Sequence, residues 1–139
     1  MISHQMRNTF QIEFVHTLYF QTLLKELVQR FESIAKKPHR TYKVISMCIH
    51  ALQDITPQLI DSSLKQVDEN ADLNLKMDVM YRKTSNLKKK DSVLLDQMKL
   101  HLLVNHKRDF TRKSIVTAIV VTAHGLNTQQ IEYILSEYQ

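Results

Sequence analysis

Residues that break regular structure are scarce in this chain of 139 residues, which contains one glycine, two prolines and no tryptophan. Tight β-turns depend on Gly, Pro and Asn to set their backbone dihedrals, and an all-β chain of this length needs many such turns. So few breakers predict a small number of long elements, which favours helices. The apolar share of 43% and the charged share of 24% are those of a globular chain. We predict one all-α domain over residues 1–139.

Cysteine is equally scarce, since Cys48 is the only one, and this excludes an intramolecular disulfide. A lone thiol favours a reducing compartment. The first residues lack the basic-then-apolar pattern of a secretory signal. The longest uncharged run, residues 114–131, becomes polar well before it reaches the roughly 20 apolar residues of a membrane span. We therefore expect an intracellular protein, cytoplasmic or nuclear, without a membrane span.

Apolar residues recur with the three-and-four spacing of amphipathic helices. The first such stretch, residues 3–37, contains neither glycine nor proline and ends before Pro38. A polar connector is expected over residues 83–90, followed by a helix capped by Asp91. The expected fold is a bundle of five or six helices with a long N-terminal helix. The other predicted helices cover residues 40–54, 56–80 with an interruption near 68–72, 91–103, 111–124 and 128–138.

Two of these interpretations have alternatives. As one continuous helix, residues 3–37 would be about 50 Å long and apolar around much of its circumference, which predicts a homodimer through this helix. The alternative is a helix that breaks near Thr17 and folds back within one subunit. Residues 114–122 are rich in Ile, Val and Thr, which favour strands. We prefer a helix there because no other stretch suggests a partner strand.

Positive charge is concentrated between residues 82 and 113, where ten Lys or Arg are opposed by three aspartates, although the whole chain is only +5. Clustered cations bind nucleic-acid phosphates by releasing counterions, and they attract acidic protein surfaces in the same way. The alternative is a solvated surface that keeps the protein soluble. Only Tyr81 and Phe110 lie close enough in sequence to stack on bases. The candidate residues for binding nucleic acid or an acidic partner are Arg82, Lys83, Lys88, Lys89, Lys90, Lys107, Arg108, Arg112 and Lys113.

Residues 117–134 have the spacing of a helix-turn-helix, with Gly125 in the turn and Thr128 as the cap of the second helix. Gln can bond adenine bidentately, so the exposed face of that helix offers base-reading candidates. These candidates are Gln129, Gln130 and Tyr133. Against DNA reading, the helix carries Glu132 and Glu137 and neither Lys nor Arg. An αα-hairpin that closes a bundle has the same pattern, and we expect this structural role.

Patterns typical of catalysis or metal binding are absent from the sequence. No two of the seven histidines are three or four residues apart, so none share a helix face as metal ligands do. His50 and Asp54 are interpreted as a surface hydrogen bond. Cys48 and His50 point to different faces of one helix, and Cys48 is expected in the core. We predict no catalytic, cofactor-binding or metal-binding residue, and hence no enzyme.

These observations predict a small, non-enzymatic regulatory protein that binds nucleic acid through residues 82–113. The alternative is a helical protein–protein interaction module, such as an adaptor or a microbial or viral antagonist, whose apolar groove holds a partner helix. A salt titration of binding to DNA and RNA separates the two, because phosphate contacts weaken steeply with salt.

Overall fold

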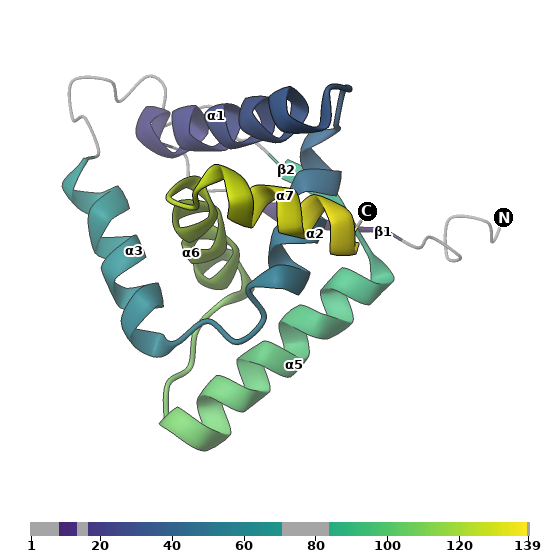
Figure 1. The fold of residues 1–139 in the computed structure, drawn as a ribbon. Coiled ribbons are helices and arrows are strands. Elements are labelled where there is room, and N and C mark those ends of the chain that lie inside the picture. The colour runs from purple at the N-terminus through teal and green to yellow at the C-terminus, as the bar shows by residue number, and fades with distance from the viewer. Residues whose placement is uncertain (1–8, 14–16, 71–83, 139) are drawn as a thin grey trace, which may run out of the picture.

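The computed structural model describes residues 9–13, 17–70 and 84–138, with side chains over 17–70 and 87–138. Six helices and a pair of short strands make up these residues (Figure 1). The predicted all-α class and the single helical bundle are confirmed. The elements are β1 (Thr9–Glu13), α1 (Leu18–Ala35), α2 (Thr41–Ala51), α3 (Pro57–Glu69), β2 (Thr84–Lys88), α5 (Lys89–His106), α6 (Arg112–His124) and α7 (Thr128–Tyr138).

The α6 helix lies at the centre of the bundle, with α1, α2, α3 and α5 packed against it (Figure 1). Its middle carries no charged residue, and an apolar surface all round a helix requires burial on every side. All residues from Ile115 to Val121 are buried. This burial explains why a stretch rich in β-branched residues is helical, since tertiary packing overrides local propensity. Within the described residues, no helix combines the length and the apolar character that crossing a membrane requires.

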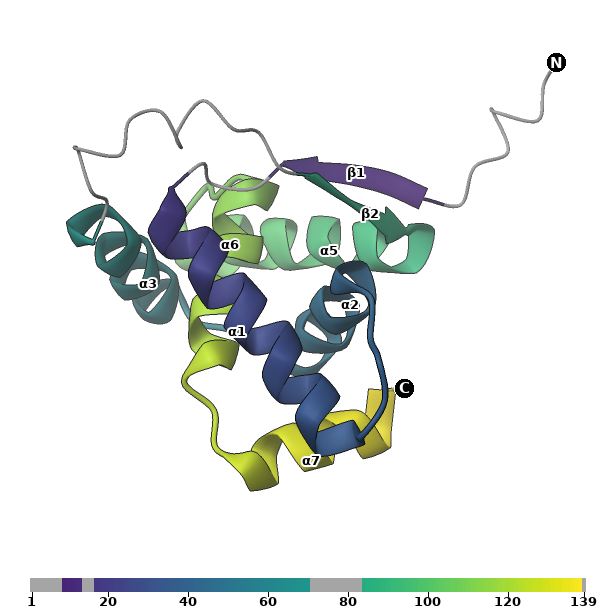
Figure 2. The same cartoon turned by 90° about the horizontal axis from the view of Figure 1, so that it is seen from above.

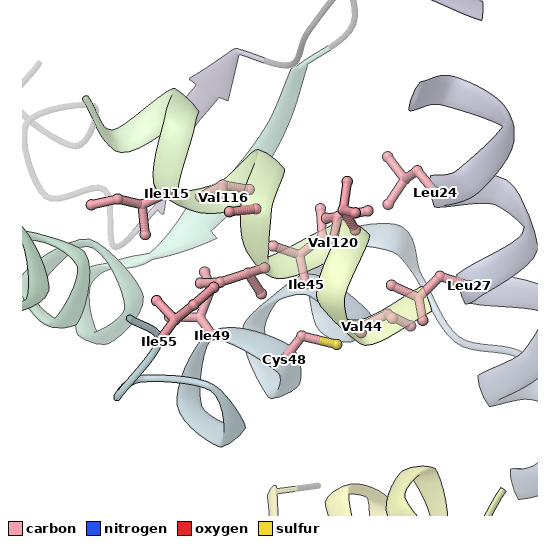
Figure 3. Close-up of a cluster of buried hydrophobic side chains, with 14 of the residues drawn as sticks. Leu24, Leu27, Val44, Ile45, Cys48, Ile49, Ile55, Ile115, Val116 and Val120 are labelled. Atoms are coloured by element: carbon pink, nitrogen blue, oxygen red, sulfur yellow. The ribbon is translucent and has the colours of Figure 1, made fainter. Parts of the chain in front are cut away.

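The core forms where α6 meets α1 and α2 (Figure 3). Leu24 and Leu27 of α1 and Val44 of α2 approach Val120 of α6. Cys48 is fully buried in this cluster, which confirms its predicted place in the core. Desolvation by burial raises the pKa of its thiol from 9.0 to about 12.

The first helix is much shorter than predicted. Thr17 caps α1, and its Oγ1 accepts a hydrogen bond from the Phe20 N–H at 3.2 Å. Residues 9–13 form strand β1 instead of helix, so the continuous helix over residues 3–37 is wrong. The break falls at Thr17, as in the alternative, but a strand precedes it. Lys36 ends α1 in the left-handed conformation, with a φ of 58°.

The prediction of a homodimer rests on a long first helix, but β1 and the shorter helix α1 replace that helix. The buried residues of α1 share one face, and α6 and α7 of the same chain pack against this helix. At 18 residues the helix is only about 27 Å long. The five buried side chains are Phe20, Leu23, Leu24, Leu27 and Phe31. The dimer stays a prediction, but α1 no longer supports it.

The two strands pair antiparallel, with Thr9 opposite Lys88 and Glu13 opposite Thr84. Figure 2 shows this ribbon beside the start of α5, into which β2 leads directly. The prediction of a polar connector over residues 83–90 is therefore wrong where β2 forms. Leu87 of this strand is buried. A buried leucine fixes the ribbon to the bundle near α2 and α5.

The remaining helix boundaries follow their local signals closely. Thr56 caps α3 and Pro57 is its first residue, as predicted. The helix ends at Glu69, within the predicted interruption, and its expected continuation to residue 80 lies largely outside the described residues. The α7 helix has the predicted bounds, but its cap is Asn127, whose Oδ1 accepts from the Gln130 N–H at 2.9 Å. Thr128, the predicted cap, is the first helical residue.

Candidate nucleic-acid interface

The α5 helix divides the predicted basic segment into two separate ends. Lys88, Lys89 and Lys90 lie at its beginning, whereas Lys107 and the residues up to Lys113 follow its end. Eighteen helical residues separate the two ends by about 27 Å. Arg82 and Lys83 lie outside the described residues. The segment is therefore not one patch, and the two ends differ in their partners.

At the C-terminal end, both arginines are already paired with carboxylates. Arg108 donates from both terminal nitrogens to Asp61 of α3, at 2.9 and 2.8 Å. Hydrogen bonding to Arg108 holds the pKa of the Asp61 carboxyl below its ordinary value, and the same bond raises the pKa of Arg108. Arg112 donates to Asp96 of α5 at 2.9 and 2.6 Å. A phosphate would have to displace these carboxylates.

Other contacts at this end also point to a structural role. The Arg108 guanidinium lies 4.7 Å from the centroid of the Phe110 ring, which is buried. Lys99 donates to Asp109 at 3.1 Å. Phe110 is consequently covered and offers no free face for a nucleobase. Among the predicted cations at this end, Lys107 is exposed, and no ion pair within the described residues involves its ammonium group.

The N-terminal end forms a pocket of about 250 Å³, which we call the lysine pocket. Three lysines from two segments meet here: Lys43 from the first turn of α2, and Lys88 and Lys90 from the start of α5. Within the described part of the chain, their ammonium groups form no ion pair. The complete lining is Tyr42, Lys43, Ser46, Met47, Lys88, Lys90, Asp91 and Tyr138.

Two tyrosines share the pocket with the lysines. Tyr42 and Tyr138 are half-buried, and Tyr138 comes from the last turn of α7. The Tyr138 ring lies 6.3 Å from the His50 ring, at an interplanar angle of 33°. Tyr81, the other aromatic residue predicted near the basic segment, lies outside the described residues. The fold thus brings aromatic side chains to the lysines from positions that the basic segment does not contain.

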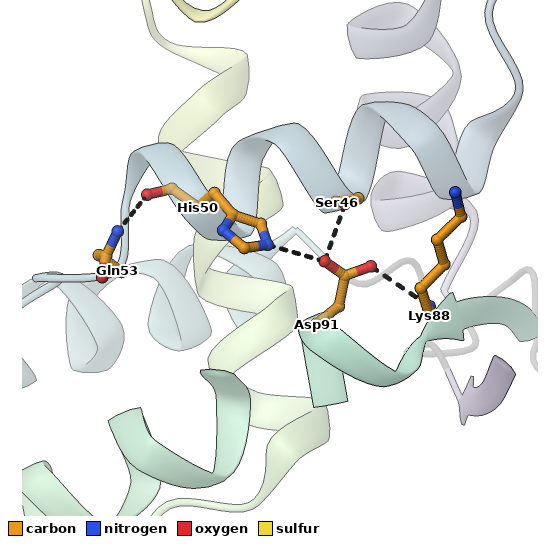
Figure 4. Close-up of polar contacts among 5 residues, drawn as sticks. All are labelled: Ser46, His50, Gln53, Lys88 and Asp91. Atoms are coloured by element: carbon orange, nitrogen blue, oxygen red, sulfur yellow. Dashed lines mark hydrogen bonds and ion pairs between the residues drawn. The ribbon is translucent and has the colours of Figure 1, made fainter. Parts of the chain in front are cut away.

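A fully buried carboxylate, Asp91, lines the pocket, and Figure 4 shows its polar contacts. Its Oδ1 accepts from Ser46 Oγ at 2.8 Å and lies 2.9 Å from His50 Nε2. Its Oδ2 accepts from the Lys88 N–H at 3.3 Å. Asp91 is therefore the third residue of α5 and bonds back to the residue that precedes the helix, whereas we predicted it as the cap itself.

Ser46, His50 and Asp91 are the residue types of a hydrolase triad, but their arrangement is different. In a triad the imidazole lies between the hydroxyl and the carboxylate and takes the proton of the hydroxyl. Here Ser46 and His50 both bond to the same Asp91 oxygen, so the hydroxyl has no base. The predicted His50–Asp54 bond is wrong, because α5 supplies the partner instead. In the described ranges, no three His, Cys, Asp or Glu side chains group as metal ligands.

The terminal hairpin contributes a second, mainly apolar pocket of about 310 Å³, the hairpin pocket. The three predicted base-reading residues line it together, and Tyr133 is well exposed. Gln130 is also engaged, because its Oε1 accepts from the Asn127 N–H at 2.8 Å. The lining consists of Ala51, Leu52, Leu126, Gln129, Gln130, Tyr133 and Ile134. These residues do not join the lysine pocket.

The turn of the hairpin is fixed to α1 by contacts that the sequence does not reveal. Arg30 donates to the carbonyl oxygens of His124 and Leu126, at 3.0 and 2.7 Å. His124 Nε2 also lies 2.8 Å from Glu26 Oε1. The arginine thereby satisfies the carbonyl group of His124, the last residue of α6, and that of Leu126 in the turn. These contacts hold the turn against α1, while a structural role of the hairpin in place of DNA reading stays a prediction.

Comparison with protein-family models, curated proteins and solved structures finds no match to this chain. No relative therefore contributes a function or a site residue.

Proposed function

We propose that this protein is a non-enzymatic binder of single-stranded nucleic acid and that the lysine pocket is its binding site. The observation that supports this most is the meeting of Lys43, Lys88 and Lys90 with Tyr42 and Tyr138 around one cavity. Proteins that bind single strands combine a positively charged groove for the backbone with aromatic faces for the bases. Both components are present here, and they come from three separate parts of the chain.

The position of the lysines argues against a purely solubilising role. Lys88, Lys89 and Lys90 are consecutive and exposed at the beginning of α5. The beginning of a helix carries a partial positive charge, so each lysine there costs up to about 1 kcal/mol where an acidic residue would stabilise the helix. Lysines at the C-terminal ends of helices would keep the protein equally soluble without opposing the helix dipole. Cations that oppose the helix dipole are better explained by an anionic ligand, which both the lysines and the dipole attract.

Single strands fit this site better than duplexes do. In a duplex the faces of the bases are stacked on one another, whereas an unpaired base can lie on a tyrosine ring. The lysine pocket presents two such rings beside the amines. Asp91 in its lining repels phosphate, but this carboxylate is already bonded to three donors and shares the pocket with three lysines. The net charge of the lining therefore still favours an anion.

The first test is the binding of labelled single-stranded oligonucleotides at about 50 mM salt, measured by fluorescence anisotropy. Reversing Lys88 and Lys90 to glutamate should weaken binding about tenfold or more. The matched control reverses Lys25 and Lys65, which are exposed on α1 and α3, and changes the net charge by the same amount. Binding should also weaken with salt, by about 0.7 log units per log unit for each phosphate contacted.

The tyrosines provide an independent test of the single-strand assignment. Changing Tyr42 and Tyr138 to leucine should lower single-strand affinity about tenfold, since stacking contributes about 1–3 kcal/mol per base. The salt dependence should not change, and phenylalanine at both positions should preserve binding. Circular dichroism checks that each variant is folded. If no oligonucleotide binds at about 50 mM salt, or if the Lys25 and Lys65 control weakens binding as much, the proposal is wrong.

A further inference from the structure

The outer face of α5 exposes a row of aliphatic side chains that the bundle does not cover. Four of the seven large hydrophobic residues that are exposed in the described part of the chain lie on this one helix. Inward-facing residues such as Leu95, Met98 and Leu102 attach α5 to the core. We call the exposed row the α5 stripe; it consists of Val93 (45% exposed), Leu100 (60%), Leu103 (46%) and Val104 (58%).

These residues share one side of the helix. Val93, Leu100 and Val104 are seven and four positions apart, a spacing that aligns side chains along a helix, and Leu103 flanks them. Figure 1 shows α5 at the edge of the bundle. Leaving so much aliphatic surface in water is unfavourable at about 25 cal/mol per Å². An exposed aliphatic surface of this kind is typical of an interaction site.

Lysines lie at both ends of the α5 stripe. Lys89 precedes Val93 by four residues and shares its side of the helix, whereas Lys107 directly follows the last residue of α5 in the left-handed conformation; both lysines are exposed. Two carboxylates lie beside Leu100 and Leu103, and each is paired with a basic residue: Asp96 with Arg112 at 2.6 Å and Asp109 with Lys99 at 3.1 Å. With both carboxylates paired, the exposed cations Lys89 and Lys107 lie near the two ends of the face, about 27 Å apart.

We propose that the α5 stripe is the docking site for an amphipathic helix of a partner protein, with aliphatic residues along one face and acidic residues at both ends. An apolar helix face buries best against another such face, with anchors that recur every three or four residues. Acidic ends would complete the match with Lys89 and Lys107 and would select the partner. This surface goes beyond the proposed function, because none of the stripe residues lines the lysine pocket.

The charges argue against a second copy of the same chain as the occupant. In an antiparallel pair of α5 helices, Lys89 of one copy would meet Lys107 of the other. In a parallel pair, each lysine would meet its own equivalent. Like charges brought together in this way oppose association, whereas a helix with acidic ends is attracted at both. The partner is therefore a different protein.

The test uses two synthetic helical peptides with the same leucine face, one with glutamates at both ends and one with lysines there. Isothermal titration calorimetry should show saturable binding of the glutamate peptide and at least about tenfold weaker binding of the lysine peptide. Reversing Lys89 and Lys107 to glutamate should exchange this preference. Such an exchange of charge selectivity is not expected from a change that merely perturbs folding.

The aliphatic residues are tested by changing Leu100 and Val104 to aspartate, which should weaken binding of the glutamate peptide about tenfold or more. The matched control changes Leu18 and Leu59, which are 46% and 44% exposed on α1 and α3, to aspartate and should leave binding intact. Oligonucleotide binding should be unaffected by either double variant, which separates this surface from the lysine pocket. Equal binding of both peptides, an equal effect of the control, or self-association abolished by Leu100→Asp would overturn the proposal.

Discussion

Replacing Asp91 should change stability and ligand affinity in opposite directions. Its carboxylate is fully buried and accepts bonds from Ser46, His50 and the backbone of Lys88. Asp91→Ala leaves all three donors without this acceptor. Each lost bond costs about 1–1.5 kcal/mol, while relief from burying a carboxylate returns part of that sum. We expect a net loss of about 3 kcal/mol, a large share of the 5–15 kcal/mol typical of a domain.

Asp91→Asn should destabilise the protein less than Asp91→Ala does. The amide oxygen can still accept hydrogen bonds on one side, although the NH2 group on the other side then faces a donor. We expect a loss of about 1–2 kcal/mol for this variant. Urea unfolding followed by circular dichroism measures both effects. With a slope near 1.5 kcal/mol per M, the unfolding midpoint should fall by about 2 M for alanine and about 1 M for asparagine. The control Asp68→Asn, on the exposed surface of α3, should leave the midpoint unchanged.

The same Asp91→Asn change should strengthen oligonucleotide binding. For a phosphate assumed to bind about 6 Å from this carboxylate, removing the negative charge is worth about 0.7 kcal/mol in water, which is about a threefold gain in affinity. Asp68→Asn changes the net charge equally but lies outside the lysine pocket, so it should give a smaller gain. If Asp91→Asn and Asp91→Ala are as stable as the wild type, the buried network does not have the energetic role argued here. If Asp91→Asn binds more weakly than wild type while folded, the lysine pocket is not the anion site.

Two further predictions concern the core and the hairpin. Because burial raises the pKa of the Cys48 thiol from 9.0 to about 12, a thiol reagent at pH 8 should label the native protein only as fast as it unfolds. Stability should also fall as the pH rises from 9 towards 12, since only the unfolded chain loses the thiol proton there; rapid native labelling would show that Cys48 is accessible. Arg30→Met removes both bonds to the α6–α7 turn and should lower the free energy of unfolding by about 2 kcal/mol. An unchanged urea midpoint would contradict that role for Arg30.

Helices defined by local signals could be predicted well. Thr56 and Pro57 mark the start of α3 with a side-chain acceptor and a preset dihedral, and both act only on neighbouring residues. The α6 helix was predictable because its sequence has no charge or helix breaker between Ser114 and Gly125. A strand was the alternative there, and the sequence suggests no strand that could pair with it. Such signals need no knowledge of the rest of the fold.

The N-terminal region could not be predicted in the same way, because its structure depends on a distant partner. Phe10, Phe14 and Leu18 are four residues apart and continue the helical spacing of α1. The strand forms because residues 9–13 pair with β2, far along the chain. Backbone pairing between distant segments leaves no mark on the apolar spacing of either one. The polar composition of β2 concealed it further, since Leu87 is its only aliphatic residue.

The lysine pocket was predictable only in part for a similar reason. Lys88, Lys89 and Lys90 are visible in the sequence as a cluster, but Lys43 joins them through the packing of α2 against α5. Nothing in its own neighbourhood distinguishes Lys43 from any other surface lysine. The same packing gives Asp91 its partners Ser46 and His50. Contacts between faces of separate helices thus decide the composition of the site.

The number of basic residues in a sequence segment overstates how many basic side chains are free to bind a ligand. The folded chain uses Arg108 and Arg112 to connect α5 with α3 and α6, and their bidentate geometry is what guanidinium groups favour with carboxylates. Among the residues that the structure describes, no ion pair engages Lys88, Lys89 or Lys90, and their place at the start of α5 opposes the helix dipole. A cation that stabilises the fold needs no further explanation. A cation that lowers the stability of the fold does need an explanation. For that reason a phosphate ligand is to be sought at the lysine pocket rather than at the more arginine-rich end of α5.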